Sequence, residues 1–524
     1  MATQHLILPR RKVSSGDDVA PSPRPVTTPM PSDFIIPTIP DLPGGLGQDA
    51  VFNRQEQLVH ALEVWNRGLS PDVRKKKYAK MKYAASDKGV EPSPFAVYRA
   101  TDHLFWQDLS HDARLHLFGN TKTHTWLSGD CHCCNLGSFH NRKGETVYAL
   151  NDFDESLVAD YQMDLWRLAV SILLAMNQVG VGNSEQNARD VIRTLGRAYR
   201  AAAVEHRAEK GAIFTSLNTT GRLQAFLRAV EGSKKFRYKK LFKKWTEGRA
   251  RRARLYQGLG AFGLKRFYAI VDLVGEGERN TGNGEGQIGG EQGAGTQTRR
   301  NREEQNGGEV GGEEDGGEKD GNNYKGRIIL DVKLQPQASA YHFMRLDERV
   351  AFRKRYENDA KRTADAAKVL MSDADPYLGW IEITADDAES FVGWTDGFYS
   401  VREISPKKSS YPVLPADAKG PLKELALKDT EGFKEMAEQW GRVLAVSHAQ
   451  AAAALEGKTE GRPDFSVELE RLTAGESMEE FEDLLWGVVS HHAKLVAEDY
   501  DTFAKYVYPY PPEVEQPVGS DDEA

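Results

Sequence analysis

The chain has 524 residues with 69 Lys and Arg against 77 Asp and Glu, so its formal net charge is −8, and 40% of its residues are hydrophobic. This composition describes an ordinary soluble protein with material for a large core, and the length allows roughly two to four domain-sized units. The charge does not favour a nucleic acid as a partner, and no apolar run approaches the ~18 residues of a membrane span, so we expect a cytoplasmic protein without a membrane partner.

Both ends of the chain have compositions that predict disorder. Residues 1–49 are rich in Pro, Ser and Gly and lack the hydrophobic core of a signal peptide. Residues 509–524 form an acidic, proline-containing tail. Apolar residues recur at helical spacing from Phe52 onward, which predicts that the folded body begins near residue 50.

The stretch Leu127–Glu155, LSGDCHCCNLGSFHNRKGETVYALNDFDE, carries the residues with the clearest chemistry. Its pattern predicts a short strand, a tight loop and a hairpin that turns at His140–Glu145. Asp130 and Asn135 have the Asp-x-x-x-x-Asn spacing of a kinase catalytic loop, and Asp152–Asp154 ends the second strand. Phosphoryl transfer needs a carboxylate that accepts the proton of the attacking hydroxyl, and an amide and a second carboxylate that hold magnesium.

Two other interpretations of this stretch stay open. The Asp-x-x-x-x-Asn spacing alone also fits a turn beside an ordinary hairpin. Cys131, Cys133 and Cys134, with His132 between them, suggest a thiolate metal site, but the sequence has no second ligand pair and adjacent cysteines point in divergent directions. Three cysteines in so long a chain also argue against a disulfide framework and for a reducing compartment.

Two predicted helices contain polar residues with expected structural roles. Asp164 begins a strongly apolar helix that lasts to about Val179, and an aspartate at a helix start usually caps it. Residues 440–455 are expected to form an alanine-rich helix in which His448 is a packed core histidine.

The basic residues 233–254 have interleaved aromatics, which fits a solvated helix better than an anion-binding surface.

Two glycine-rich segments have different compositions and different expected roles. Gly258, Gly260 and Gly263 form G-x-G-x-x-G ahead of a predicted strand, residues 266–274. That order suits a loop that folds over phosphates and argues against a Rossmann turn. Residues 276–325 are roughly one-third glycine with almost no apolar residues, which predicts a disordered insertion.

Four blocks in chain order resemble an uncharacterised family, domain of unknown function 2252. They are SPFAVYRAT at 93–101, GDCHCCNLGSF at 129–139, LNDFDES at 150–156 and DLWRLAVS at 164–171. The family has similar SPFAFxRG, GDxHxxNFG, NDFDE and WDxxRLxxS blocks. The resemblance covers residues 55–508 apart from the insertion. The family is placed with the protein-kinase-like and aminoglycoside-phosphotransferase-like proteins, which implies a kinase-like fold.

Further blocks that resemble the family imply roles for the nucleotide site. GLGAFGLKRF at 258–267 is similar to a GTGSLGxERY-like block. GRIILDVK at 326–333 is similar to a strand with LLDLKEA, so the resemblance makes Lys333 the lysine that contacts the α- and β-phosphates. Residues 350–371 are expected to form a helix. A block similar to RVVEGQR falls on residues 362–368 and implies that Asp365 is the acidic partner of that lysine, with Glu357 as a rival.

The order of these motifs predicts a permuted fold. The Asp130 loop and Asp152–Asp154 come before the glycine loop and Lys333, which is the reverse of an ordinary kinase. We therefore expect an α+β, protein-kinase-like, two-lobed fold that is circularly permuted, with a small antiparallel-sheet lobe and a mainly helical lobe. Residues 398–403, FYSVRE, are expected to form a strand and resemble the family's FYVRxL block.

The expected organisation divides the chain into five parts. In order these are the disordered arm 1–49, a helical catalytic lobe 50–256 with the catalytic loop and metal-binding hairpin, a nucleotide-binding sheet lobe 257–410 with the insertion 276–325, a helical segment 411–508 that completes the catalytic lobe, and the tail 509–524.

The implied function is ATP- and Mg²⁺-dependent phosphoryl transfer to an unidentified hydroxyl-bearing acceptor, a small molecule being favoured over a protein. The expected roles are Asp130 as catalytic base, Asn135, Asp152 and Asp154 as metal ligands, and Gly258, Gly260, Gly263, Lys333 and Asp365 at the nucleotide. Two alternatives stay open: transfer of AMP from a reversed ATP, and an inert nucleotide-binding scaffold. The acceptor and the oligomeric state are not readable from the sequence.

Overall fold

The computed structural model describes residues 53–86, 89–209, 213–233, 265–272, 327–371, 375, 377–386, 395–405, 407–418 and 420–511. Predictions for residues 1–49, 234–254, 258–263, 276–325 and 512–524 lie outside the described residues. Residues Ile270–Ile329 form a separate compact unit, in which only the strand residues 270–272 and 327–329 are described. The sites below belong to the other unit, Met1–Ala269 and Leu330–Ala524.

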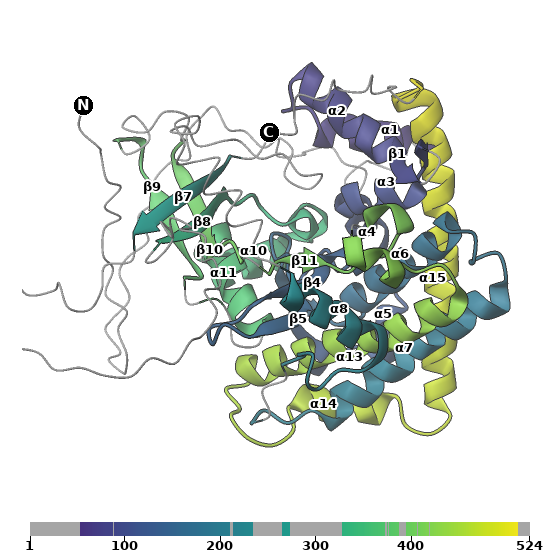
Figure 1. Ribbon diagram of the computed structural model, residues 1–524, viewed down its shortest axis with the longest axis vertical. Coiled ribbons are helices and arrows are strands. Elements are labelled where there is room, and N and C mark those ends of the chain that lie inside the picture. The colour runs from purple at the N-terminus through teal and green to yellow at the C-terminus, as the bar shows by residue number, and fades with distance from the viewer. Residues whose placement is uncertain are drawn as a thin grey trace, which may run out of the picture. The chain divides into compact units, whose positions relative to one another are not determined.

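The described helices and strands follow one another as labelled in Figure 1. The helices are α1 (Arg54–Trp65), α2 (Pro71–Lys82), α3 (Pro94–Ala100), α4 (Asp102–Leu109), α5 (Leu115–Phe118), α6 (Gln162–Gln178), α7 (Glu185–Glu205), α8 (Gly221–Gly232), α10 (Leu346–Arg355), α11 (Asp359–Leu370), α13 (Thr430–Leu455), α14 (Asp464–Leu472) and α15 (Ser477–Thr502). The strands are β1 (Tyr83–Ser86), β2 (Gly89–Pro92), β3 (His124–Leu127), β4 (Leu136–His140), β5 (Thr146–Leu150), β6 (Leu157–Asp160), β7 (Arg266–Asp272), β8 (Arg327–Leu334), β9 (Gly379–Ile383), β10 (Gly397–Glu403) and β11 (Ser409–Ser410).

The architecture is mixed α+β, as the sequence predicts. Helices form most of the described structure, and the strands form small sheets in the orders β1-β2, β7-β8-β10-β9, β11-β4-β5 and β3-β6. The strand pairs whose register is defined are antiparallel. None of the described helices is both long enough and apolar enough to cross a membrane.

Helix α6 is buried along nearly its whole length, and its prediction from an apolar run is confirmed. Every residue from Gln162 to Met176 is buried. Helices α3, α7, α13 and α15 all contact it, so it has no solvent-facing stripe. A helix that is apolar on all sides is stable only when other elements surround it in this way.

Helices α7 and α13 pack against each other at close range, and Figure 1 shows them side by side. Helix α7 buries Val191, Leu195 and Tyr199 on one face. On α13 the facing position is Gly441, where an added Cβ would lie 2.6 Å from the carbonyl oxygen of Leu195. The absence of a side chain therefore allows the two backbones to approach.

The predicted hairpin is confirmed between β4 and β5. Their register runs from Leu136 opposite Leu150 to His140 opposite Thr146, and Asn141 N donates to the Glu145 carbonyl at 3.0 Å. Residues 128–135 connect β3 to β4, and residues 151–156 connect β5 to β6. Both loops therefore cross between the same two sheets, which brings them side by side.

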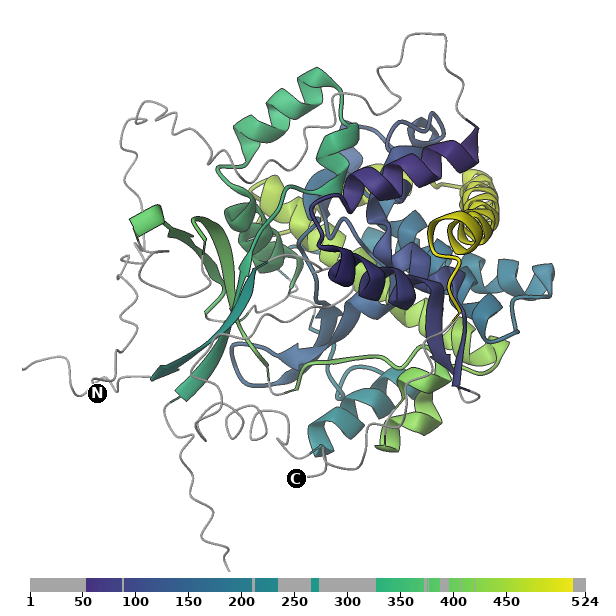
Figure 2. The ribbon, with the colours of Figure 1, turned by 90° about the horizontal axis from the view of Figure 1, so that it is seen from above.

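The four-stranded sheet contains the predicted strands around Lys333 and residues 398–403. Helix α11 contacts β9 and β10 of this sheet and also contacts α13 and β3, so it separates the sheet from the helical layer (Figure 2). The sequence predicts continuous helix over 350–371, but the structure has α10 and α11 with a break at residues 356–358. Asn358 causes the break because its side chain caps α11 by accepting from Lys361 N at 2.7 Å.

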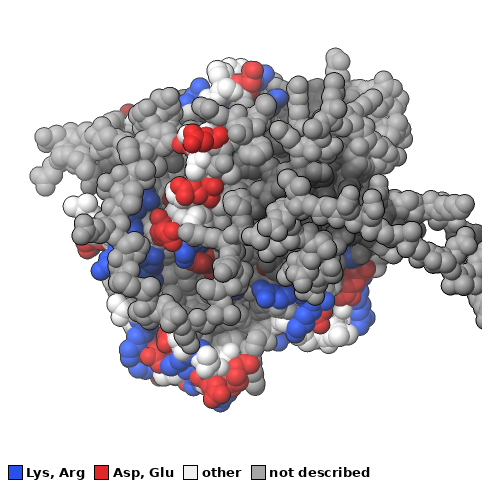
Figure 3. Space-filling view, turned by 90° about the vertical axis from the view of Figure 1, so that its left-hand side faces the viewer, with Lys and Arg blue, Asp and Glu red and all other residues white. Residues whose placement is uncertain are grey.

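Charged side chains of both signs occur on the described surface. The face shown in Figure 3 has Lys and Arg next to Asp and Glu among its described residues. Mixed charge of this kind is typical of a solvated surface.

Substitution of Gly441 tests the contact between α7 and α13. We expect Gly441→Ala to lower the free energy of unfolding by roughly 1–3 kcal/mol, because the new methyl group overlaps the Leu195 carbonyl. Gly487→Ala in α15 is the matched control, since an added Cβ there meets nothing within 4 Å. That variant should be more stable by roughly 0.5–1 kcal/mol, the usual gain of Ala over Gly inside a helix. Urea unfolding of both variants decides the matter, and equal effects would refute close packing at Gly441.

Candidate functional site

The backbone just before Asp130 is fixed by the carboxylate of Asp164. Its Oδ2 accepts from Ser128 N at 2.7 Å, and its Oδ1 accepts from Gly129 N at 3.0 Å. Gly129 has φ +82, and an added Cβ would lie 2.0 Å from the Glu155 carbonyl oxygen. Glycine is therefore required at 129, and the 128–135 loop enters the site with a defined direction.

Asp164 serves this loop, and the cap expected for its own helix is not observed. The N-cap residue of α6 is Tyr161, whose side chain makes no capping hydrogen bond, and Asp160 Oδ1 accepts from Gln162 N at 3.0 Å. The Oδ2 of Asp164 also lies 3.3 Å from Nε2 of His448, whose Nδ1 lies 2.8 Å from the Tyr199 hydroxyl. His448 has no exposed surface, so its prediction as a packed core histidine is confirmed.

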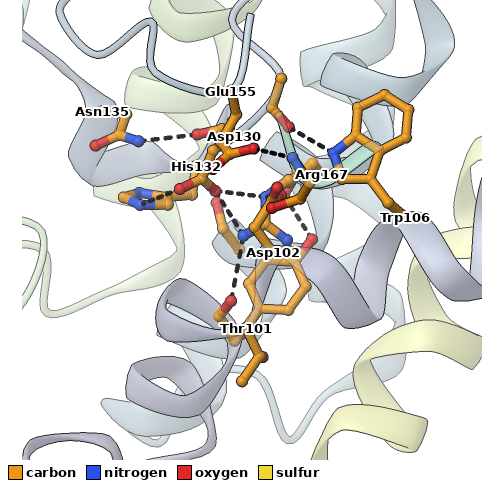
Figure 4. A network of polar contacts seen from close by, with 12 residues as sticks. Thr101, Asp102, Trp106, Asp130, His132, Asn135, Glu155 and Arg167 are labelled. Atoms are coloured by element: carbon orange, nitrogen blue, oxygen red, sulfur yellow. Dashed lines mark hydrogen bonds and ion pairs between the residues drawn. The ribbon is translucent and has the colours of Figure 1, made fainter. Parts of the chain in front are cut away.

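Asp130 is held by Arg167 of helix α6, a side chain with no exposed surface. The Nε and Nη2 atoms of Arg167 lie 2.6 and 2.5 Å from Oδ1 of Asp130 (Figure 4). The guanidinium carbon lies 4.5 Å from the ring centroid of Tyr98 and 5.1 Å from that of Phe105. The two rings confine Arg167, and Arg167 in turn fixes the orientation of Asp130 and supplies a counter-charge.

A second carboxylate, Asp102, shares this guanidinium. Its Oδ1 lies 3.0 Å from Nε of Arg167, so one buried cation faces two acids. Burial raises the pKa of Asp130 to about 7, against the opposing effect of Arg167. Burial also raises the pKa of Asp102 well above its ordinary value. A carboxylate with a pKa near neutrality is well matched to accept a proton in a reaction at neutral pH.

Asn135 joins the Asp130 loop to the strand end that precedes Asp152. Its Nδ2 donates to the backbone carbonyl of Asp130 at 2.9 Å, and its own backbone carbonyl accepts from Asn151 N at 3.0 Å. Since the amide NH₂ group is used within the loop, the side-chain oxygen of Asn135 is the atom that a cation would meet.

The cysteines of this loop are free thiols. Cys131 and Cys133 are buried, and burial raises the pKa of both thiols well above its ordinary value. Among the residues that the structure describes, no group of three or more His, Cys, Asp or Glu side chains is arranged to hold a metal ion. The described residues therefore contain no metal site built from these side chains alone, with or without thiolates.

Lys333 on β8 forms an ion pair with Asp154. Gln335 Nε2 donates to the other carboxylate oxygen of Asp154 at 2.9 Å and to Ser400 Oγ at 2.7 Å. Burial acts to raise the pKa of Asp154, but the ion pair with Lys333 outweighs it and holds the pKa below its ordinary value. The structure thus brings two predicted site residues together, one from the hairpin and one from the sheet.

Asp365 has a different partner from the expected one. Its carboxylate lies 2.5 Å from Nζ of Lys361 and 3.9 Å from that of Lys368, on the exposed side of α11. The α11 residue that reaches the site is Arg362, which is 1% exposed. Sequence reasoning did not single out Arg362.

Arg362 ties the hairpin to the sheet. Its Nη2 donates to the Asp154 carbonyl at 2.8 Å and to the Pro336 carbonyl at 3.2 Å, and its Nη1 donates to the Ser156 carbonyl. Its Nε lies 3.1 Å from Asp359 Oδ1. One side chain therefore links the segment after Asp152 to the segment after Lys333, which positions the Lys333–Asp154 pair.

Asp152 has no hydrogen bond or ion pair with another described side chain. It lines a cavity of about 50 Å³ between the hairpin end and the sheet. Burial, followed by the charge of Asp154, raises the pKa of Asp152. The charged groups that line this cavity are three acids and three cations: Asp152, Asp154, Asp331, Arg266, Lys333 and Arg402.

A larger cavity, about 700 Å³, lies between α7 and α13, among Arg197, His206 and Arg442. None of the predicted site residues lines it. We place the site at the smaller cavity because the unpartnered Asp152 and the Lys333–Asp154 pair both face that one.

Three charged lining residues were missed by sequence reasoning: Arg266, Asp331 and Arg402. Arg266 pairs with Asp331 on the neighbouring strand through Nε at 2.7 Å. Arg402 lies opposite Asp331 in the β8–β10 register. The strands themselves were predicted, and the two-residue period places Asp331 on the same face as Lys333. The register between strands, which brings in Arg402, is not encoded in any local pattern.

Replacement of Arg362 tests its linking role. We expect Arg362→Met to lower the free energy of unfolding by roughly 3 kcal/mol or more, because several buried carbonyls and Asp359 lose their donor. Arg353→Met is the matched control, since Arg353 lies 3.8 Å from the same Asp359 but is 49% exposed. That variant should change stability by less than roughly 0.5 kcal/mol. Chemical denaturation compares the two, and a small effect of Arg362→Met would contradict the assignment.

The comparison with protein families gives one match. A family described as "Uncharacterized protein conserved in bacteria (DUF2252)" matches residues 75–269 and 318–506, which is more than half of the chain. The matched segments contain Asp130, Asp152, Asp154 and Lys333. No curated protein and no solved structure matches the chain.

Proposed function

Because the chain belongs to the DUF2252 family, whose description names no activity, we propose a function from the chemistry of the site: ATP- and Mg²⁺-dependent transfer of a phosphoryl group to a hydroxyl-bearing acceptor. A small molecule is the favoured acceptor. The observation that carries the proposal is the cavity where the unpartnered Asp152 faces Lys333, beside the loop of Asp130.

The charges of this cavity support a phosphate ligand with a metal. Asp152 is a half-buried carboxylate without a partner among the described residues, which is unfavourable unless a cation joins it. The positively charged side chains of Lys333 and of the arginines that line the cavity can donate hydrogen bonds to phosphate oxygens. If the two loops only packed against the sheet, an unpaired acid at position 152 would have no structural role.

The oxygen donors present fit Mg²⁺. Asp152 and the side-chain oxygen of Asn135 would hold it, with Asp154 as a further carboxylate. Mg²⁺ is usually held by one or two carboxylates together with substrate phosphates, so a larger protein cage is not required. When bound, the ion supplies positive charge that stabilises the transferring phosphate.

In the transfer step one proton moves, one bond forms and one bond breaks. The acceptor oxygen forms a bond to the γ-phosphorus while the bond from that phosphorus to the β–γ bridging oxygen breaks, so ADP leaves. Asp130 Oδ2 takes the acceptor proton, and Arg167 keeps Oδ1 in place. Lys333 binds the phosphates and keeps them aligned with the acceptor oxygen. For this, its Nζ must leave the carboxylate of Asp154 and contact phosphate oxygens instead.

We propose the permuted, two-lobed kinase-like fold together with this function. An antiparallel sheet with the lysine on one strand, a helix that packs on the sheet, and a hairpin with paired acids on the helical side support it. In the chain, the hairpin of Asp130 and Asp152 precedes the sheet of Lys333. The expected cover of the phosphates, Gly258–Gly263, lies outside the described residues.

Labelled ATP tests the reaction class. Incubation of the full chain with Mg²⁺, cell extract and ATP labelled at the γ- or the α-phosphate should transfer label from the γ-position only. Transfer from the α-position would instead establish AMP transfer. Absence of transfer from either, with retained ATP binding, would leave the chain as a nucleotide-binding scaffold and would overturn the proposal.

Asp130 and Asp152 should fail in different ways when replaced. Asp130→Asn should slow γ-label transfer roughly 10²–10⁴-fold and keep the thermal shift by ATP with Mg²⁺, because Asp130 contacts the acceptor. Asp152→Asn should lose both transfer and that thermal shift. Asp160→Asn is the control, since Asp160 is a buried acid of the β3–β6 sheet that does not line the cavity. Full transfer by Asp130→Asn would remove it as the base.

A further inference from the structure

The sheet face that lines the cavity carries a ladder of three charged residues on three adjacent strands. Arg266 on β7 donates to Asp331 on β8 through Nε at 2.7 Å and also through Nη2. Arg402 on β10 lies opposite Asp331, with its Nε 3.7 Å from Oδ2. All three side chains line the cavity, on the same face as Lys333.

The ladder has one carboxylate for two guanidiniums. Asp331 is only 6% exposed at its side chain and uses both oxygens on Arg266. Arg402 is therefore the cation that this carboxylate satisfies least. The side chain of Arg402 is 30% exposed, so a bound anion could supply the counter-charge that Asp331 provides only in part.

Arg402 also contacts residues 151–156, the loop that contains Asp152. Its Nη1 donates to the carbonyl of Asn151, the residue before Asp152, at 2.9 Å. A group bound by Arg402 would thus lie next to Asp152. Lys408 also lies near Asp152 and Asp331, and burial lowers its pKa to about 7.

The charge count of the cavity changes when a divalent cation is present. The lining holds Asp152, Asp154 and Asp331 against Arg266, Lys333 and Arg402, which balance one another. A divalent cation at Asp152 and Asp154 would leave an excess of two positive charges among these groups. A ligand with several negative charges within a short span would restore the balance.

We propose that Arg266 and Arg402 form a polyphosphate subsite on the sheet face, in addition to Lys333. The inference rests on the proposed function, because it assigns the same cavity to a nucleotide with a polyphosphate tail. Arg402 is the main contact of the ligand and Arg266 a second one, and without ligand Asp331 offsets part of their positive charge. On binding, the lysine and arginine side chains that now pair with Asp154 and Asp331 would contact phosphate oxygens instead, which would enlarge the cavity of about 50 Å³.

Inorganic tripolyphosphate with Mg²⁺ is the probe, because it has the tail without the base. Calorimetric titration of the full chain should give a dissociation constant that Arg402→Met weakens roughly 10- to 100-fold, as expected for loss of a charge-assisted contact. Arg402→Lys should fall between. Arg193→Met is the matched control, since Arg193 is 29% exposed and Arg402 is 30% exposed, and Arg193 pairs with acids away from the cavity. The control should bind as the wild type does.

Asp331→Asn separates a binding role from a structural one. If the ladder binds phosphate, this variant should be less stable without ligand and yet bind tripolyphosphate more tightly, because both arginines lose their internal counter-charge. If the ladder only supports the sheet, stability and affinity fall together, and the inference is overturned. It is overturned as well if the wild type does not bind tripolyphosphate, or if Arg402→Met binds it as tightly as the wild type does.

The outcome is independent of catalysis. Tripolyphosphate binding that depends on Arg402, with no transfer of label from ATP, would support the subsite and overturn the proposed reaction. Transfer of γ-label with unchanged tripolyphosphate binding by Arg402→Met would support the reaction and overturn the subsite.

Discussion

The ion pair between Lys333 and Asp154 is the interaction on which the site depends. It joins two residues that are 179 positions apart, one on β8 and one at the end of the β4–β5 hairpin. Both side chains are largely shielded, at 10% and 21% exposure, so each charge needs its partner. Gln335 and Arg362 bind the same hairpin end, so the position of the acids is set by the sheet and by α11.

Features encoded by local patterns were predictable from the sequence. The hairpin follows from two apolar runs around a turn with Asn141 and Gly144, and α6 follows from its apolar run. The break between α10 and α11 was missed because Asn358 also fits an interior helical position, although its side chain is a good helix cap. The role of Arg362 was not predicted for the same reason, because Arg362 lies in the first turn of the second helix.

Partners that are distant in sequence were not predictable. Asp365 was assigned to Lys333 because of a block similar to the family, yet a local i,i+4 contact with Lys361 satisfies it. Asp130 was recognised by spacing, but its partner Arg167 comes from another element, 37 residues later. The cross-strand ladder depends on register, which follows from tertiary packing and not from strand propensity.

The balanced charges of the cavity would couple the binding of its two proposed ligands, phosphate and metal. An anionic ligand alone would meet the uncompensated Asp152, and a divalent cation alone would leave Lys333 and Arg402 with fewer acids to satisfy them. Each ligand removes the electrostatic obstacle to the other, and such coupling is reciprocal. Arg402 is suited to carry it, because it contacts the carbonyl next to Asp152 from the sheet side. If phosphate and metal bind as proposed, the arginines beside Asp331 and the acids Asp152 and Asp154 would therefore make the binding of each ligand favour that of the other.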